Sequence, residues 1–402
     1  MVNTLFVNMN LFVGDQEEII SNAWFAVNQE GKIIEQGQGK IDSTIEFEKQ
    51  IDLKGQFVMP GLINAHAHPG SVVNLEDPFP VTEVSTTLAA ERDLASALKG
   101  GVTSIRATGV PFDVDIKLKK MRHWLNFAGP GIVASGRPIS IPGGHGDEPT
   151  DASDHETEGI LINGPEEMRA AIRRQFKLGA DNIKIMATGG VMSVGDEVDD
   201  TELSLEEIEM AVKESHSKHM TICAHAQGET GIHFCVEAGV DSIEHGIYVS
   251  DNDIELMKEK GIFLTPTLCA PHEMLKHGEG IIPPEAFRKA KEVVEDAYNN
   301  AGKAIKKGVK LALGTDAGTW FNPIEDTAKE LRELVKAGAT SFQALQAGGL
   351  GSAQLLKIDK EFGTLEEGKF ADFIVLKENP LDDVTNVLQQ DKQVFQHGER
   401  KF

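Results

Sequence analysis

Residues 59–68 read Met59-Pro60-Gly61-Leu62-Ile63-Asn64-Ala65-His66-Ala67-His68. The Pro-Gly pair marks a turn, and the apolar residues after it are typical of a buried strand. On a strand, residues i and i+2 point to the same side, so His66 and His68 can bind one metal ion together. Two ordinary histidines are the alternative. The stretch predicts a buried strand that carries metal-binding side chains at its carboxyl end.

From this stretch onward, apolar runs alternate with amphipathic segments. Eight runs are predicted to be strands: 61–66, 102–107, 131–135, 182–187, 220–225, 242–245, 263–267 and 310–315. Eight strands over about 300 residues, with helices between most of them, match an α/β fold of the (β/α)8 or TIM-barrel type. A doubly wound open sheet is the competing fold. It predicts a Gly-rich turn after the first strand, and no such turn follows here.

Helix signals support this alternation. Residues 165–178 begin with Pro and two Glu, and Ser204 with Glu207 forms a capping box that opens a helix to about residue 218. Three further helices are expected at 251–260, 284–307 and 324–336. Glycines that suit helix C-termini follow four of these segments: Gly179, Gly261, Gly308 and Gly338.

Both chain ends have a different pattern. Short alternating runs at 5–7, 23–27 and 32–36 are separated by turn signals, and 371–376 and 393–396 are strand-like as well. We therefore expect a small β-sandwich domain built from residues 1–58 and 359–402. It would flank a barrel domain of residues 59–358.

Composition narrows the class of protein. The chain has 402 residues, 40 % of them hydrophobic and 25 % charged, as in soluble globular proteins. Lys and Arg number 39 against 63 Asp and Glu, and the formal charge of −24 disfavours nucleic acid and anionic membranes as partners. The N-terminus lacks a basic leader, and no apolar run is long enough to span a membrane. We expect a cytoplasmic protein. A homo-oligomer is possible, although no segment identifies an interface.

Further polar residues belong to other predicted strands: Lys184 lies within one, His225 and His245 end two others, and Asp316 directly follows the last. A lysine within an apolar strand must be paired or solvated, and each of the four alone has an ordinary structural explanation. Together with His66 and His68, they fall on the first, fourth, fifth, sixth and eighth of the eight predicted strands. A barrel places its active site at these carboxyl ends.

With these residues, the chain resembles the amidohydrolase superfamily. Within it, the closest resemblance is to the imidazolonepropionase-like branch of metal-dependent dipeptidases and carboxypeptidases, which includes prolidase and Xaa-Arg dipeptidase. The resemblance covers nearly the whole chain, and seven stretches carry it: 59–68, 101–106, 183–193, 224–226, 243–246, 314–318 and 368–372.

The resemblance implies a centre of two divalent metal ions, most often Zn²⁺. Its ligands would be His66, His68 and Asp316 on the more buried ion, His225 and His245 on the more exposed ion, and a carbamylated Lys184 bridging both. Imidazole and carboxylate ligands suit zinc, and manganese or cobalt fit the same set. A lysine that gains CO₂ becomes an anion with two oxygen donors, which suits two cations.

The resemblance also implies a reaction. A hydroxide that bridges the two ions would attack the amide bond of a dipeptide or an N-acyl amino acid, and Asp316 would be both ligand and general acid/base. A cyclic amide hydrolase of the imidazolonepropionase type shares every metal motif. A non-catalytic scaffold that kept the barrel is the alternative from a different class.

Substrate contacts are less well defined. His145 resembles a loop histidine that the family uses near the substrate, and Tyr248 resembles a tyrosine suited to a substrate carboxylate. A solvated loop histidine and a rim aromatic are the alternatives. The acidic loop of Asp147, Glu148 and Asp151 favours a cationic substrate. The sequence leaves the roles of four side chains open: Arg106, Met192, Gln227 and Trp320.

Overall fold

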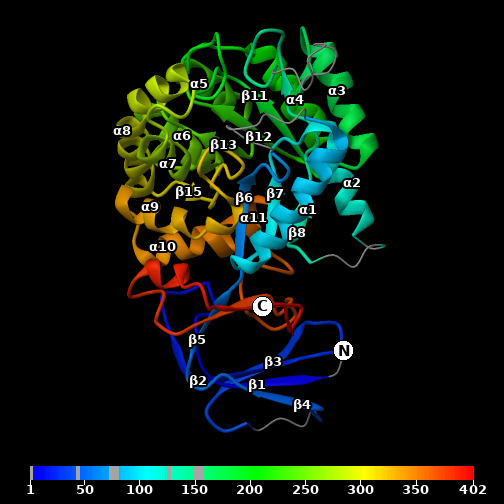
Figure 1. Ribbon diagram of the computed structural model, residues 1–402, viewed down its shortest axis with the longest axis vertical. Coiled ribbons are helices and arrows are strands. Elements are labelled where there is room, and N and C mark those ends of the chain that lie inside the picture. The colour runs from blue at the N-terminus through cyan, green and yellow to red at the C-terminus, as the bar shows by residue number, and fades with distance from the viewer. Residues whose placement is uncertain (1–2, 42–45, 72–80, 123, 125–127, 148–157) are drawn as a thin grey trace.

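The computed structural model describes residues 3–41, 46–71, 81–122, 124, 128–147 and 158–402. Figure 1 shows a larger part, in which helices surround strands, above a smaller part made of strands that holds the N-terminus. The predicted mixed α/β fold with an additional β domain is confirmed.

The strands of the larger part are parallel and form two sheets. One sheet has the order β6 (Leu62–Ala67), β7 (Val102–Ala107) and β8 (Gly131–Val133). The other has the order β10 (Ile160–Leu161), β9 (Ile139–Ser140), β11 (Asn182–Met186), β12 (Thr221–Ala226), β13 (Ser242–His245), β14 (Phe263–Thr265) and β15 (Lys310–Leu311). A strand is therefore present at each of the eight predicted positions.

Hydrogen bonds link the two sheets at both ends. The carbonyl of Ala134, just after β8, accepts bonds from the amides of Asp181 and Asn182 at the start of β11, at 2.8 and 3.2 Å. On the other side, the Ala65 amide of β6 donates to Leu313 O at 2.7 Å, beyond β15. The parallel strands thus follow one another in a barrel-like order.

The described helices cover the outside of these strands in Figure 1. They are α1 (Glu83–Lys99), α2 (Val114–Met121), α3 (Pro165–Leu178), α4 (Leu205–His216), α5 (Glu229–Ala238), α6 (Asp251–Lys260), α7 (Cys269–His277), α8 (Pro284–Lys307), α9 (Lys329–Ala337), α10 (Ser341–Gln346) and α11 (Ser352–Leu355). The expected helices 165–178, 251–260 and 284–307 are confirmed residue for residue. The Ser204–Glu207 capping box is also confirmed.

The predicted helix 324–336 is wrong as one continuous segment. A short 3₁₀ turn (Ile324–Asp326) precedes α9, and Thr327 lies between them. The Thr327 hydroxyl donates to Ile324 O at 2.8 Å and accepts a bond from the Asn64 side chain at 2.9 Å. This buried contact with β6 interrupts the helix, and amphipathic periodicity does not reveal it.

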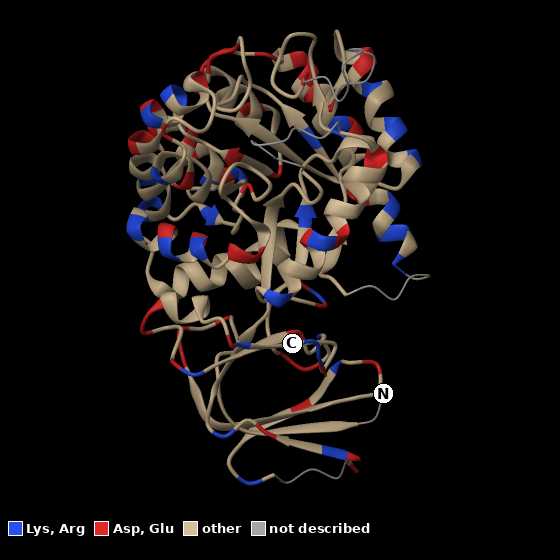
Figure 2. Ribbon diagram, in the orientation of Figure 1, with Lys and Arg blue, Asp and Glu red and all other residues tan. Residues whose placement is uncertain are grey.

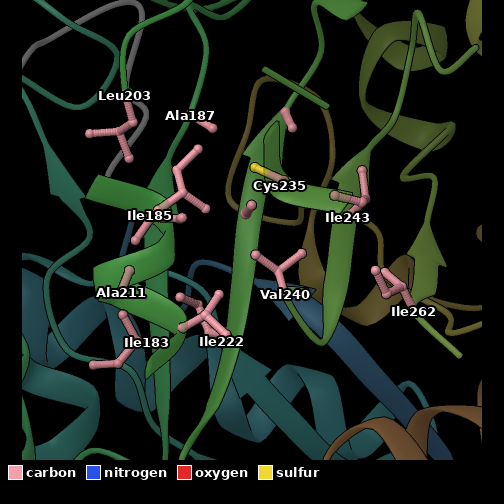
Figure 3. Close-up of a cluster of buried hydrophobic side chains, with 14 of the residues drawn as sticks. Ile183, Ile185, Ala187, Leu203, Ala211, Ile222, Cys235, Val240, Ile243 and Ile262 are labelled. Carbon is pink, nitrogen blue, oxygen red and sulfur yellow. The ribbon is translucent and has the colours of Figure 1, made fainter. Parts of the chain in front are cut away.

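Alternation along β11 decides which residues face the helices and which face the opposite side of the sheet. Ile183 and Ile185 point outward into an apolar core, where they pack with Ile222, Ile243 and Ala211 of α4, as Figure 3 shows. Because neighbouring strand residues point to opposite faces, the intervening Lys184 points inward.

The smaller part is one sheet made from both chain ends. Its strands are β1 (Thr4–Leu11), β2 (Ile20–Val27), β3 (Ile33–Gln38), β4 (Lys49–Asp52), β5 (Phe57–Pro60), β16 (Phe373–Leu376), β17 (Gln393–Gln396) and β18 (Glu399–Arg400). β5 pairs with both β1 and β16, so it joins the two ends. The sheet folds over a core in which Phe6 contacts Phe25, Phe373 and Phe395, with ring centroids 5.2–5.5 Å apart.

Charged residues gather on the outer helices of the larger part, whereas the strands of both parts are mostly uncharged (Figure 2). Among the described helices, none combines the length and the apolar character that crossing a membrane requires.

Candidate active site

A cavity of about 150 Å³ lies at the carboxyl ends of the parallel strands. Seven of the residues singled out from the sequence line it: His66, His68, His145, Lys184, His225, His245 and Asp316. Residues up to 250 positions apart in the chain therefore meet in one place. Six of them come from the end of a strand or the loop after it, as the sequence predicted, and Lys184 lies in the middle of β11.

His66, His68 and Asp316 form the tightest group. Asp316 Oδ1 lies 3.3 Å from His66 Nε2 and 3.0 Å from His68 Nε2. The Asp316 backbone has a φ of 58°, and its amide donates to His66 O at 2.9 Å. A left-handed conformation is uncommon for a non-glycine residue, and residues in it cluster at functional sites. Here it accompanies the turn that brings the carboxylate against the two imidazoles.

His225 and His245 complete the wall of imidazoles. The His225 and His245 ring centroids are 4.7 Å apart, and those of His245 and His66 are 5.1 Å apart. Burial lowers the pKa of both His225 and His245 well below the usual value, so both rings are neutral. The neutral imidazole is the form that binds a metal ion.

Each ring is held through one nitrogen. His68 Nδ1 lies 2.9 Å from Gly109 O, and His225 Nε2 lies 3.0 Å from Gly189 O. A carbonyl can only accept, so these nitrogens donate, and in a neutral ring the other nitrogen keeps its lone pair. His66 Nδ1 contacts Glu244 Oε2 at 2.6 Å in the same manner. Histidines that bind metals are usually oriented in this way.

This donor arrangement fits a divalent metal ion. With Nδ1 donating to Glu244, the lone pair of His66 Nε2 faces Asp316 Oδ1 at 3.3 Å. His66 Nε2 is also buried and has no hydrogen-bond partner within the described chain. Two lone pairs and a carboxylate oxygen repel one another at such distances unless a cation lies among them. The three residues therefore have the chemistry of a metal site, and their ligand atoms lie within 4.8 Å of one another.

Lys184 is the least ordinary member of the group. It is 2 % exposed, and within the described chain its amine makes no hydrogen bond or ion pair. Burial lowers the pKa of the amine, while the surrounding anionic groups oppose this shift. Burial therefore favours the uncharged amine, which is the form that can react with CO₂.

Comparison with known proteins identifies a family in which a metal site at this position is expected. A model of the amidohydrolase family matches residues 57–399. The chain belongs to the amidohydrolase family. Ochratoxinase from Aspergillus niger is 31 % identical over 360 residues, which are 84 % of this chain and 73 % of that protein.

Two solved structures cover 99 % of this chain with 99 % of their own. One is a Xaa-Pro dipeptidase with methionine bound in its active site, at a TM-score of 0.91 and 31 % identity. The other is a prolidase complexed with N-methylphosphonate-L-proline, at a TM-score of 0.88 and 28 % identity. The resemblance to the dipeptidase branch of the amidohydrolases is thus confirmed.

In this amidohydrolase, Arg106 lies behind the histidines in a buried ion pair. Its Nη2 lies 2.7 Å from Glu244 Oε1, and its Nε donates to Ala65 O at 2.5 Å. Both charged side chains are fully buried. Arg106, whose role the sequence left open, therefore holds Glu244, which in turn holds His66. Sequence reasoning missed Glu244, although it directly precedes His245.

We expect Arg106→Met to lower the free energy of unfolding by about 3–5 kcal/mol, because it leaves the buried Glu244 carboxylate without its cation. Urea unfolding of the variant and the parent measures this change. Arg92→Met, which removes a largely exposed pair with Asp93, is the matched control and should have a much smaller effect. Similar losses in both variants would contradict the buried role of Arg106.

The remaining predicted residues differ in their distance from the cavity. Met192 and Gln227 line it, whereas Tyr248 and Trp320 are not among its described lining residues and pack beside the apolar cluster of α7 and α8. The Tyr248 amide donates to Gln227 O at 3.0 Å, and its role in substrate binding stays a prediction.

The acidic loop offers little support for a cationic substrate. Asp147 Oδ2 accepts the Gly143 amide at 2.7 Å, so this carboxylate stabilises its own turn. Glu148 and Asp151 lie outside the described residues. Much of the described cavity wall is apolar, with contributions from Val191, Ile247, Ala270, Met274, Val293 and Ala297.

Proposed function

We propose that this amidohydrolase cleaves the amide bond of a dipeptide or an N-acyl amino acid at a centre of two divalent metal ions, with Zn²⁺ as the first candidate. One observation carries the proposal: five imidazoles, the Asp316 carboxylate and the buried Lys184 amine, which has no partner within the described chain, line one cavity. The dipeptidase and the prolidase among the similar structures support an amide substrate.

We propose the following ligands: His66, His68 and Asp316 on one ion, His225 and His245 on the other, and Lys184, as its carbamate, on both. When bound, the ions would polarise the amide carbonyl and lower the pKa of a water molecule. The apolar wall would exclude bulk water, which strengthens electrostatic interactions inside the cavity.

Side chains of this protein would carry out the proton transfers. Asp316 would accept a proton from the attacking water and pass it to the leaving amine, and the bond from its amide to His66 O at 2.9 Å fixes the position of its backbone. Glu244 and Arg106 would keep the His66 ring in the correct tautomer through the contacts described above. His145 and Tyr248 would contact the substrate.

We further propose that the strands at the eight predicted positions close into a (β/α)8 barrel of residues 59–358. The bonds of Ala134 and Ala65 across both gaps between the sheets support closure. We also propose a β-sandwich domain of residues 1–58 and 359–402. The pairing of β5 with β1 and β16 joins both chain ends in one sheet, and this sheet folds over the core around Phe6.

A panel of dipeptides and N-acyl amino acids, varied at the C-terminal residue and assayed with the zinc-loaded protein, tests the function. We expect release of a free amino acid from at least part of the panel. Ring opening of a cyclic amide without amino-acid release would favour the imidazolonepropionase type of activity. Elemental analysis separates both from a scaffold, because fewer than about one ion per chain after metal-replete growth would contradict any two-metal hydrolase.

A further inference from the structure

A fully buried lysine lies behind the cavity wall. Lys289 of α8 is 0 % exposed, and its amine donates to the carbonyls of Gly190, Ser193 and Asp196 at 2.7–2.9 Å. It also lies 2.9 Å from Asp196 Oδ1. A buried ammonium ion is costly unless it is paired and fully hydrogen-bonded, and Lys289 meets both conditions. It therefore anchors the 190–196 loop to α8.

The chain of bonds continues from Asp196 to His145. Ser193 Oγ lies 2.7 and 2.5 Å from the two carboxylate oxygens of Asp196, and His145 Nδ1 lies 2.8 Å from Ser193 Oγ. The carboxylate can only accept, so the single hydroxyl proton of Ser193 goes to Asp196. Ser193 Oγ must then accept from His145, and His145 Nδ1 carries a proton.

The His145 ring is also confined from several sides. A Cβ atom on Gly190 would lie 2.4 Å from His145 Cε1, so the ring occupies the space that a side chain would need. The ring of His225 lies beside it, with centroids 4.3 Å apart. The His145 amide donates to Glu202 Oε1 at 2.7 Å, which fixes the loop backbone. Within the described chain, His145 Nε2 has no hydrogen-bond partner, and the residue lines the cavity.

We propose that Lys289, Asp196 and Ser193 are positioning residues that hold His145 in its Nδ1–H tautomer, so that Nε2 is presented to the substrate as a hydrogen-bond acceptor. The matching substrate group is a donor, an amide N–H or an ammonium. This inference rests on the proposed function, because it places the substrate in the same cavity.

Nitrogen-15 NMR of the zinc-loaded protein, labelled at histidine, tests the tautomer directly. The signals lost in His145→Gln identify this ring. We expect a protonated Nδ1 and an unprotonated Nε2 in the parent protein and in Ser193→Thr, which keeps a hydroxyl group, and a shift towards Nε2–H in Ser193→Ala. A His145 tautomer that is the same in Ser193→Ala as in the parent would overturn the proposal.

A double-mutant cycle tests the role in turnover. We expect Ser193→Ala to lower kcat/KM by about 10-fold, the size of one lost hydrogen bond, and by less than about 2-fold when His145 is already Gln. Metal content should not change. Ser217→Ala, which removes a hydroxyl bonded to Glu214 O after α4, is the control and should leave kcat/KM unchanged.

Equal losses in both backgrounds would overturn the proposal, because Ser193 would then act independently of His145. A parent protein that hydrolyses no amide would refute the proposed function, and the NMR experiment would still decide the role of Ser193.

Discussion

Asp316→Asn should lower kcat for amide hydrolysis by about 10³-fold or more and leave the fold intact. Proton transfer by a positioned side chain contributes about 10²–10⁴-fold to a rate. Asn matches the volume of Asp, but it can neither accept a proton from water nor return one to the leaving amine. It also removes the anion that faces the His66 and His68 nitrogens at 3.3 and 3.0 Å.

Steady-state kinetics, circular dichroism and metal analysis together check this expectation. Because Asp316 has two proposed roles, metal content must be measured for each preparation, and kcat must be compared at saturating zinc. Asp391→Asn, in an exposed pair with Lys377, is the matched control and should keep the parental kcat. Near-parental turnover of Asp316→Asn would remove the acid/base role. An unfolded variant would show instead that the carboxylate is needed for stability.

The strands and most helices could be predicted because their signals are local. Ser204 and Glu207 are three residues apart and cap one helix, and Gly179 ends another in the left-handed conformation that glycine favours. The eighth strand is shorter than predicted because the chain leaves the ladder early. Leu313 bonds to Ala347 O, not to β14. Ala347 is distant from Leu313 in the sequence, so no local sequence pattern reveals this contact.

The candidate site was predictable for a related reason. Parallel strands that follow one another in order bring their carboxyl ends together, so position on a strand was enough to place Lys184 and the histidines in one cavity. The residues that orient them were not predictable. Glu244, Ser193 and Lys289 act through contacts with residues 48–178 positions away in the sequence. No local sequence motif marks any of the three. Only the fold shows which partner each one meets.

Lys184→Ala should bind far less metal than the parent, falling from about two ions per chain to about one or fewer, and should lose nearly all activity. The amine has no partner within the described chain, so its burial among four imidazoles is explained if it carries CO₂ and bridges two cations. Removing it would delete both oxygen ligands of the proposed carbamate at once. Elemental analysis after dialysis measures the loss, and Lys177→Ala, exposed near the end of α3, is the control.

Chemical rescue separates a carbamate from a merely structural lysine. The space left in Lys184→Ala can admit a short carboxylic acid such as acetate or propionate, which offers the same two oxygens to the ions. We expect partial recovery of metal content and activity with added acid, and none in Lys184→Met, where the side chain fills that space. The metal content of the parent protein should also rise when bicarbonate is added. Full metal content in Lys184→Ala without added acid would refute the bridging carbamate, because the five remaining ligands would then suffice.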